Sequence, residues 1–185
     1  MILVDIENLK YPIGKFSAPK EFSPALMKQW IHAIEELPSK LRSAVIHLND
    51  QQLDTPYRDG GWTVRQVVHH IPDSHMNAYI RFKLAMTEDI PTIKPYFEDR
   101  WADLADYRNT PVEPSLSLLE ALHYRWELLL KTMTDDDFKK KYHHPESHKD
   151  FELRTVLALY AWHGNHHLAH ITSLLIREGW NTGKK

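Results

Sequence analysis

The sequence predicts an all-α protein, a four-helix bundle of the type that has one long crossover connection. Four long segments repeat apolar residues at three- and four-residue spacing, which is typical of helices, and no strong alternating pattern indicates a strand. Proline- and glycine-containing stretches separate the four segments. The chain has 185 residues, of which 42% are hydrophobic, so we expect one domain over residues 1–185.

The chain begins with an expected irregular arm, and the first helix follows it. Residues 1–22 contain two prolines and a glycine, which disfavour regular structure. Ser23 suits the N-cap of a helix, and Pro24 suits its first position, where a missing N–H costs nothing. Pro38 predicts a kink or a restart in this helix. We expect a connection at residues 53–61.

The second and third helices flank the predicted crossover. Thr63 and Gln66 have the spacing of a capping box, which indicates the start of the second helix. Residues 89–114 hold four prolines and few periodic apolar positions, so we expect the long crossover there. Ser115 is the expected start of the third helix.

A polar segment and a last helix complete the predicted bundle. Residues 135–150 are polar and predict a loop with one helical turn, which the acidic residues after Thr134 favour. The apolar pattern of residues 152–178 predicts the last helix, and Gly179 suits its end.

Composition excludes several classes of function. A net charge of −2 gives no general attraction to nucleic acid or to an anionic membrane. The sequence has no apolar run of the ~18 residues that span a bilayer. Asp5 comes too early for a signal peptide, so we expect a cytoplasmic protein. The chain has no cysteine, which excludes disulfides and thiolate ligands, and any thiol must come from outside.

Histidine is unusually frequent, with 13 residues, and the last helix carries two pairs at a spacing of four. Two imidazoles four residues apart on a helix can bind one metal ion. His163 and His167 follow the apolar row of this helix, whereas His166 is expected at its edge. His170 falls close to the same row, so the pair of His166 and His170 competes. Core histidines that hydrogen-bond to buried carbonyls would explain this helix equally well.

A second histidine cluster on the second helix favours a metal site. Two imidazoles leave a tetrahedral ion short of ligands, and an opposite helix must supply the third. His70 lies three residues past Val67 on the row expected to face inward, whereas His69 lies nearer the opposite side. We therefore predict His70, His163 and His167 as metal ligands. Three neutral imidazoles leave a fourth position open, as in catalytic sites, where the ion lowers the pKa of a water or thiol.

Other polar and aromatic residues give weaker signals. Asp73 and His75 fit two roles equally well, as hydrogen-bond partners of a ligand imidazole or as part of a solvated polar face. We interpret three histidines of the polar loop as solvated, namely His143, His144 and His148. We interpret three tryptophans as core aromatic residues, namely Trp62, Trp126 and Trp162.

Several motifs together resemble a known family. Residues 56–70 read PYRDGGWTVRQVVHH and residues 73–77 read DSHMN. The pattern includes YPIG near the start and, near the end, WH, HH and AHI at 162–163, 166–167 and 169–171. Over nearly the whole chain the sequence resembles the DinB-like superfamily. Within it, the likeness is to the YfiT-type branch, whose members are described as metal-dependent hydrolases and as bacillithiol transferases.

The resemblance implies a four-helix bundle with one ligand from the second helix and two from the last, at His70, His163 and His167. It also implies one nickel or zinc ion per subunit, a homodimer and bacillithiol as a thiol cosubstrate. Pro72 stands where the family usually keeps a residue that suits a helix. Because proline removes the backbone bond to residue 68, we expect a kink beside His70.

Three functions follow as hypotheses, each with a small-molecule substrate or a bound ion and without nucleic acid or membrane. The favoured one is a metal-dependent transferase that passes bacillithiol to an electrophile. The second is a metal-dependent hydrolase that uses metal-bound hydroxide. The third is a non-catalytic metal-binding module of a stress response. No catalytic residue beyond the metal ligands is assigned.

Overall fold

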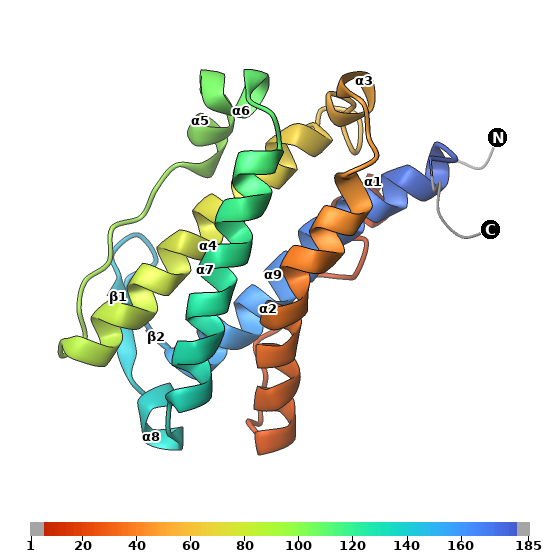
Figure 1. Cartoon of the computed structure of the whole chain (residues 1–185). Helices are drawn as coiled ribbons and strands as arrows, with labels where there is room; N and C mark the ends of the chain where they lie inside the picture. The colour runs from red at the N-terminus through yellow and green to blue at the C-terminus, as the bar shows by residue number, and fades with distance from the viewer. Residues whose placement is uncertain (1–5, 181–185) are drawn as a thin grey trace.

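The computed structural model describes residues 6–180 and consists mainly of four long helices (Figure 1). Helix α2 contacts α7 and α9, and α4 contacts the same two helices, so each long helix has two neighbours among the other three. This arrangement confirms the predicted all-α fold and four-helix bundle. The four helices are α2 (Pro24–Val45), α4 (Val64–Thr87), α7 (Glu113–Thr132) and α9 (Leu153–Arg177).

Short elements cover the two ends and one side of the bundle. Figure 1 shows α3, α5 and α6 together at one end, with α8 at the other end and the two strands beside α4. The strands form an antiparallel hairpin in which Lys141 pairs with Glu152. The short helices are α1 (Ile6–Lys10), α3 (Asp50–Leu53), α5 (Glu98–Ala102), α6 (Ala105–Asn109) and α8 (Asp135–Phe138), and the strands are β1 (Lys141–His144) and β2 (Lys149–Glu152).

The predicted helix caps of α2 and α4 are present. Ser23 accepts a hydrogen bond from the backbone N–H of Leu26, at 3.2 Å. Thr63 and Gln66 form the reciprocal capping box at the start of α4. Helix α2 continues through Pro38, so the predicted restart is wrong. Helix α4 likewise continues through Pro72.

Three other boundaries differ from the sequence predictions. The arm contains the short helix α1, and its residues 1–5 lie outside the described residues. Helix α7 begins at Glu113, before Ser115, because Pro114 fits the first turn of a helix. The expected crossover holds α5 and α6.

The hairpin was not predicted, since residues 135–150 were interpreted as a loop. Each strand has only four residues, too few for a clear alternation of polar and apolar side chains. Bonds to the distant crossover hold β1 in place. The N–H of His143 donates to the carbonyl of Pro91 at 2.9 Å, and the N–H of Ile93 donates to the carbonyl of His143 at 3.0 Å.

The buried apolar side chains form two clusters along the bundle axis. One surrounds Trp126 and is called the Trp126 cluster. The other surrounds Leu119 and is called the Leu119 cluster. On α7, the buried His123 lies between these two residues in sequence. On α4, His75 lies in sequence between Ile71, which belongs to the Leu119 cluster, and Ala78, which belongs to the Trp126 cluster. A polar layer therefore separates the two clusters.

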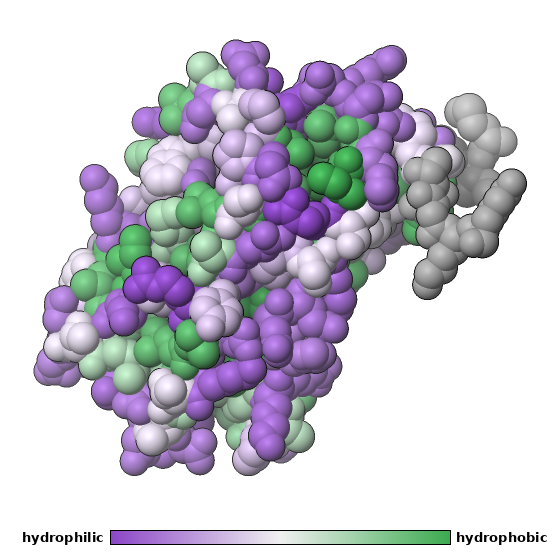
Figure 2. Space-filling view, viewed as in Figure 1, coloured by the Kyte–Doolittle hydropathy of each residue, from purple (hydrophilic) through white to green (hydrophobic). Residues whose placement is uncertain are grey.

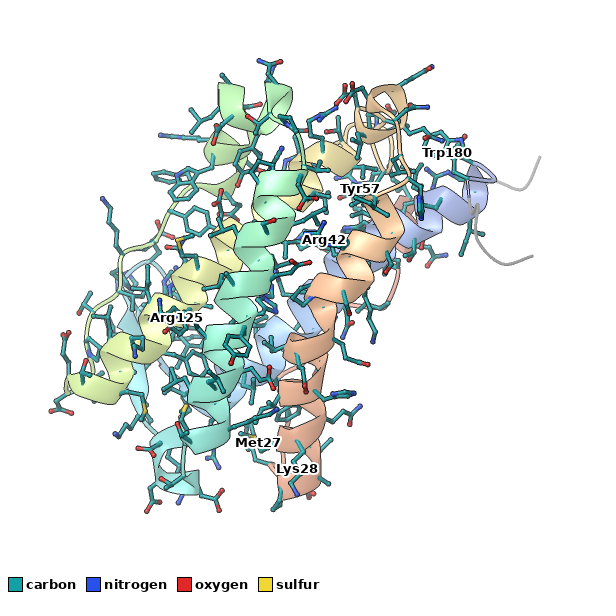
Figure 3. The ribbon with its side chains drawn as sticks, viewed as in Figure 1. Met27, Lys28, Arg42, Tyr57, Arg125 and Trp180 are labelled. Atoms are coloured by element: carbon teal, nitrogen blue, oxygen red, sulfur yellow. The ribbon has the colours of Figure 1, made fainter. Side chains whose placement is uncertain are left out.

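The surface in Figure 2 mixes polar side chains with small groups of apolar ones. None of the helices in the described part of the chain is long and apolar enough to cross a membrane. Figure 3 shows Arg42 on the side of α2 that faces α7. Its guanidinium donates to Glu113, at 2.6 and 2.9 Å, and to Glu120, at 2.5 Å, and so links the two helices on the solvent side.

Candidate metal centre

Helices α4 and α9 bring three imidazoles together. One nitrogen each of His70, His163 and His167 lies within 4.8 Å of the other two. Nε2 of His70 is 3.3 Å from Nε2 of His163. The ring centres of His163 and His167 are 4.5 Å apart, as expected for residues one helical turn apart. The structure thus groups the three residues predicted as ligands, and metal binding by them stays a prediction.

Small and aromatic neighbours shape the group. A Cβ at Gly164 would collide with the side chain of Leu37, so glycine allows the close approach of α9 to α2. The Trp62 ring lies 4.7 Å from the ring centre of His70 and stacks on His167 at 6.2 Å. Trp62 was interpreted as a core aromatic residue, but it packs against the group and lines a cavity.

Burial keeps the three imidazoles neutral at pH 7. It lowers the pKa of His70 to about 4. Burial, aided by the neighbouring imidazoles, lowers the pKa values of His163 and His167 well below the ordinary value of 6.5. A neutral imidazole keeps a lone pair on one nitrogen, so each ring can bind an ion without first losing a proton.

The donor set fits a divalent metal ion. Two nitrogens bound to one tetrahedral zinc ion at about 2.0–2.1 Å are roughly 3.3 Å apart, and the Nε2 atoms of His70 and His163 have this separation. Nδ1 of His70 and Nδ1 of His167 are buried without a hydrogen-bond partner among the described residues, as are the Nδ1 atoms of His166 and His170, so this feature does not distinguish the two pairs. Within residues 6–180, no Asp or Glu side chain joins the group. Three imidazole nitrogens suit zinc or nickel.

The group lies on the wall of a cavity of about 800 Å³. The arm, the 57–62 loop, the crossover and the hairpin complete the wall. Its charged side chains include Lys10, Arg58 and Arg81 with Glu98 and Asp99. The hairpin contributes His144, which was interpreted as a solvated loop residue and lies on the cavity wall, outside the three-histidine group.

The competing pair on α9 holds the N-terminal arm. Nε2–H of His170 donates to the carbonyl of Lys10 at 3.0 Å, and the His170 ring stacks on Tyr57 at 4.0 Å. His166 stacks on Tyr11 at 5.9 Å and on Trp162 at 4.4 Å. Both residues are buried, and these contacts give the second histidine pair on α9 a role in holding the arm.

The other two candidates on α4 point away from the group. Nδ1 of His69 lies 2.7 Å from the hydroxyl of Ser115, and its Nε2–H donates to the carbonyl of Thr110 at 3.2 Å. Asp73 accepts a hydrogen bond of 2.5 Å from the hydroxyl of Tyr107. The contacts of His69 agree with its predicted place on the opposite side of the helix.

His75 contacts the nitrogen of His163 that faces away from His70. Its Nε2 lies 3.2 Å from Nδ1 of His163, so it is buried and contacts a predicted ligand, whose binding of a metal stays a prediction. Nδ1 of His75 lies 2.9 Å from Nε2 of His123 on α7. His123 was not singled out from the sequence. The available signal was a histidine between Leu119 and Trp126, within the apolar row of α7.

Comparison with known proteins gives consistent matches. A family model described as the DinB superfamily matches residues 33–171. "Putative metal-dependent hydrolase YfiT" of Bacillus subtilis is 52% identical over 174 residues, which cover 94% of this chain and 98% of that protein. "Putative metal-dependent hydrolase OB0782" of Oceanobacillus iheyensis is 56% identical over 173 residues, 94% and 99% of the two chains.

A solved structure is also similar. It is YfiT from Bacillus subtilis, described as a probable metal-dependent hydrolase with an unusual four-helix bundle topology. The TM-score is 0.91 at 52% identity, and the match covers 94% of this chain and 99% of that one. At this similarity the two chains share the arrangement of helices that builds the histidine group.

Proposed function

This chain belongs to the DinB superfamily, and from that premise we propose that it is a metal-dependent enzyme. His70, His163 and His167 would hold one divalent ion, nickel or zinc. The observation that carries the proposal is the convergence of three neutral imidazoles on the wall of a large cavity. When bound, such an ion lowers the pKa of a thiol or water in its remaining position.

The favoured reaction is transfer of a low-molecular-weight thiol, bacillithiol by resemblance, to an electrophile. The three-histidine group suits a thiol and water alike, because an ion with an open position lowers the pKa of either. Because the chain has no cysteine, the thiol must enter as a cosubstrate.

The cavity supplies binding and orientation. A volume of about 800 Å³ accommodates a small thiol and an electrophile together. Lys10, Arg58 and Arg81 on its wall can bind negatively charged groups of either molecule. Trp62 and Tyr57 offer aromatic faces to the less polar parts and exclude water from them.

Thiol conjugation tests this proposal directly. The zinc- or nickel-loaded protein is incubated with bacillithiol and a chromogenic electrophile, and its metal content is measured in parallel. We expect conjugation above background that is lost in His163→Ala and kept in His69→Ala, since His69 bonds only to Ser115 and Thr110. Background conjugation by a protein that contains one ion per chain would overturn the transferase proposal.

A second function, hydrolysis, is favoured by the names of the relatives. It predicts that the loaded protein cleaves chromogenic esters or amides without added thiol. The same His163→Ala and His69→Ala variants serve as site and control. The non-catalytic module predicts neither activity, together with a large loss of melting temperature when all three histidines are replaced by alanine.

Assembly and location accompany the proposal. We propose a homodimer in the cytoplasm that binds neither nucleic acid nor membrane. Light scattering on the full chain, whose mass is 21.8 kDa, tests the dimer, because a dimer has twice that mass. A mass of one chain at all concentrations would refute it.

A further inference from the structure

Each of the four long helices places one polar group in the layer between the Trp126 and Leu119 clusters. Nδ1 of His163 on α9 lies 3.2 Å from Nε2 of His75 on α4. Nδ1 of His75 lies 2.9 Å from Nε2 of His123 on α7. Nδ1 of His123 lies 2.6 Å from the backbone carbonyl of Ile34 on α2. We call these four groups the histidine series.

A proline makes the last acceptor of the series available. In a helix the carbonyl of residue 34 would accept from the N–H of residue 38, but Pro38 has no N–H. Ile34 and Pro38 are both buried, so water cannot supply the missing donor easily. The ring of His123 supplies it. The proline expected to kink α2 therefore frees a carbonyl for a side chain of the opposite helix α7.

The carbonyl fixes the direction of every hydrogen bond in the series. A carbonyl only accepts, so the proton of His123 is on Nδ1, and its Nε2 must accept in the neutral ring. Nδ1–H of His75 then donates to His123, and Nε2 of His75 accepts. Nδ1–H of His163 donates to His75 in turn. The lone pair of His163 is left on Nε2, the nitrogen that faces Nε2 of His70.

His75 and His123 are almost fully buried, which disfavours the charged ring. Burial lowers the pKa of His123 to about 4. His75 and His123 have partners for both ring nitrogens. Reversing one bond would leave the buried Ile34 carbonyl facing a ring nitrogen without a proton, so the reversal is penalised at that end.

We propose that His75 and His123 are positioning residues that hold His163 as its Nδ1–H tautomer, with the carbonyl freed by Pro38 as the fixed end. A free neutral histidine favours the other tautomer, whose Nε2 proton would block a metal ion. The role of the histidine series in metal binding rests on the proposed metal site. Its tautomers, however, exist in the metal-free protein and can be measured there.

Nuclear magnetic resonance on the metal-free protein tests the direction. Long-range ¹H–¹⁵N spectra at pH 7 distinguish the two nitrogens of each ring. We expect the proton on Nδ1 in His163, His75 and His123. In His123→Phe, which keeps a planar ring without nitrogens, His75 loses its acceptor, so His163 should show both tautomers or the reversed one.

Zinc affinity gives a second readout, measured by competition with a chelator. We expect His123→Phe to bind zinc about 10–100-fold more weakly, the usual effect of removing a partner of a ligand histidine. His69→Phe is the matched control, because His69 is another buried histidine of the bundle with partners at both nitrogens outside the series. His123→Gln should restore tautomer and affinity, since its amide can donate to Ile34 and accept from His75.

The outcomes separate this inference from the proposed function. A proton on Nε2 of His163 in the wild-type protein overturns the inference. So does a folded His123→Phe whose tautomers and zinc affinity match those of His69→Phe. If His123→Phe does not fold, the spectra of wild type and of His123→Gln still decide. Expected tautomers in a protein that binds no zinc would instead refute the proposed metal site and leave the series intact.

Discussion

Acid should destabilise the metal-free protein well above the pH at which carboxylates titrate. Burial lowers the pKa values of His70 and His123 to about 4 in the folded protein, from an ordinary 6.5. Between pH 4 and 6.5 the unfolded chain therefore binds more protons than the folded one. The free energy of unfolding then rises with pH, so stability is lost as pH falls from about 6.5 towards 4.

The size of this loss follows from the two shifts. Each extra proton bound by the unfolded chain changes the free energy of unfolding by about 1.4 kcal/mol per pH unit. From pH 7 to pH 5, His70 and His123 together contribute a loss of about 4 kcal/mol. His75, His163 and His167 are shifted in the same direction and add to it. A single domain has only about 5–15 kcal/mol in total.

Carboxylates do not mask the effect. Hydrogen bonds to His32 and Lys40 lower the pKa values of Glu35 and Glu36 from the ordinary 4.5. These two groups therefore change the free energy of unfolding only below about pH 5. Asp73 acts in the opposite direction, because burial raises its pKa. It is one group against at least five histidines, so the net change keeps its sign.

Guanidinium unfolding in the presence of a chelator, followed by circular dichroism at pH 7, 6 and 5, measures the loss. We expect the midpoint to fall steeply while the denaturant dependence stays constant. His123→Phe removes one titrating group, so its stability should depend on pH less steeply, by about 1 kcal/mol per pH unit between pH 7 and 5. Equal midpoints at pH 7 and pH 5 would refute the reasoning, since they would mean equal proton binding in both states.

Three further predictions concern packing, capping and a buried carboxyl. Gly164→Ala should lose about 1–3 kcal/mol in thermal unfolding, since its Cβ collides with Leu37, and an unchanged melting temperature would contradict the packing. Thr63→Ala should lose about 1 kcal/mol in the same assay, because it removes the N-cap of α4, whereas Thr63→Ser should not. Tyr107→Phe should raise the pKa of Asp73 in a carbon-13 titration, because the lost hydrogen bond favours the charged form, and a lower pKa would exclude that bond.

The long helices were predictable because their signals are local. Apolar spacing and caps at Ser23 and Thr63 depend on residues within a few positions of one another, and the structure has both caps. The hairpin at residues 141–152 depends instead on bonds to the crossover, about 50 positions earlier in the chain. Periodicity over four residues cannot register such contacts. The start of α7 was missed by two residues, because Ser115 bonds to His69 and does not cap the helix.

The grouping of the site was predictable for a similar reason, and its support was not. Helical spacing placed His163 and His167 on one face, and the need for a third donor from another helix indicated His70. Spacing assigns a face to a histidine but not a partner on another helix. His123 was therefore not singled out from the sequence, because its contact with His75 arises only in the packed bundle.

The same packing explains how a core can hold so many polar rings. A line of buried neutral imidazoles is stable only if each N–H meets an acceptor, so the line needs an acceptor without a proton at one end. In a regular helix each interior carbonyl already accepts one backbone N–H. Pro38 removes one of those bonds at the buried face of α2, and Ile34 becomes the required end. The opposite end then necessarily carries an unused lone pair. Since that end is His163, at the cavity wall, the packing of the four helices leaves the accepting nitrogen at its Nε2, 3.3 Å from Nε2 of His70.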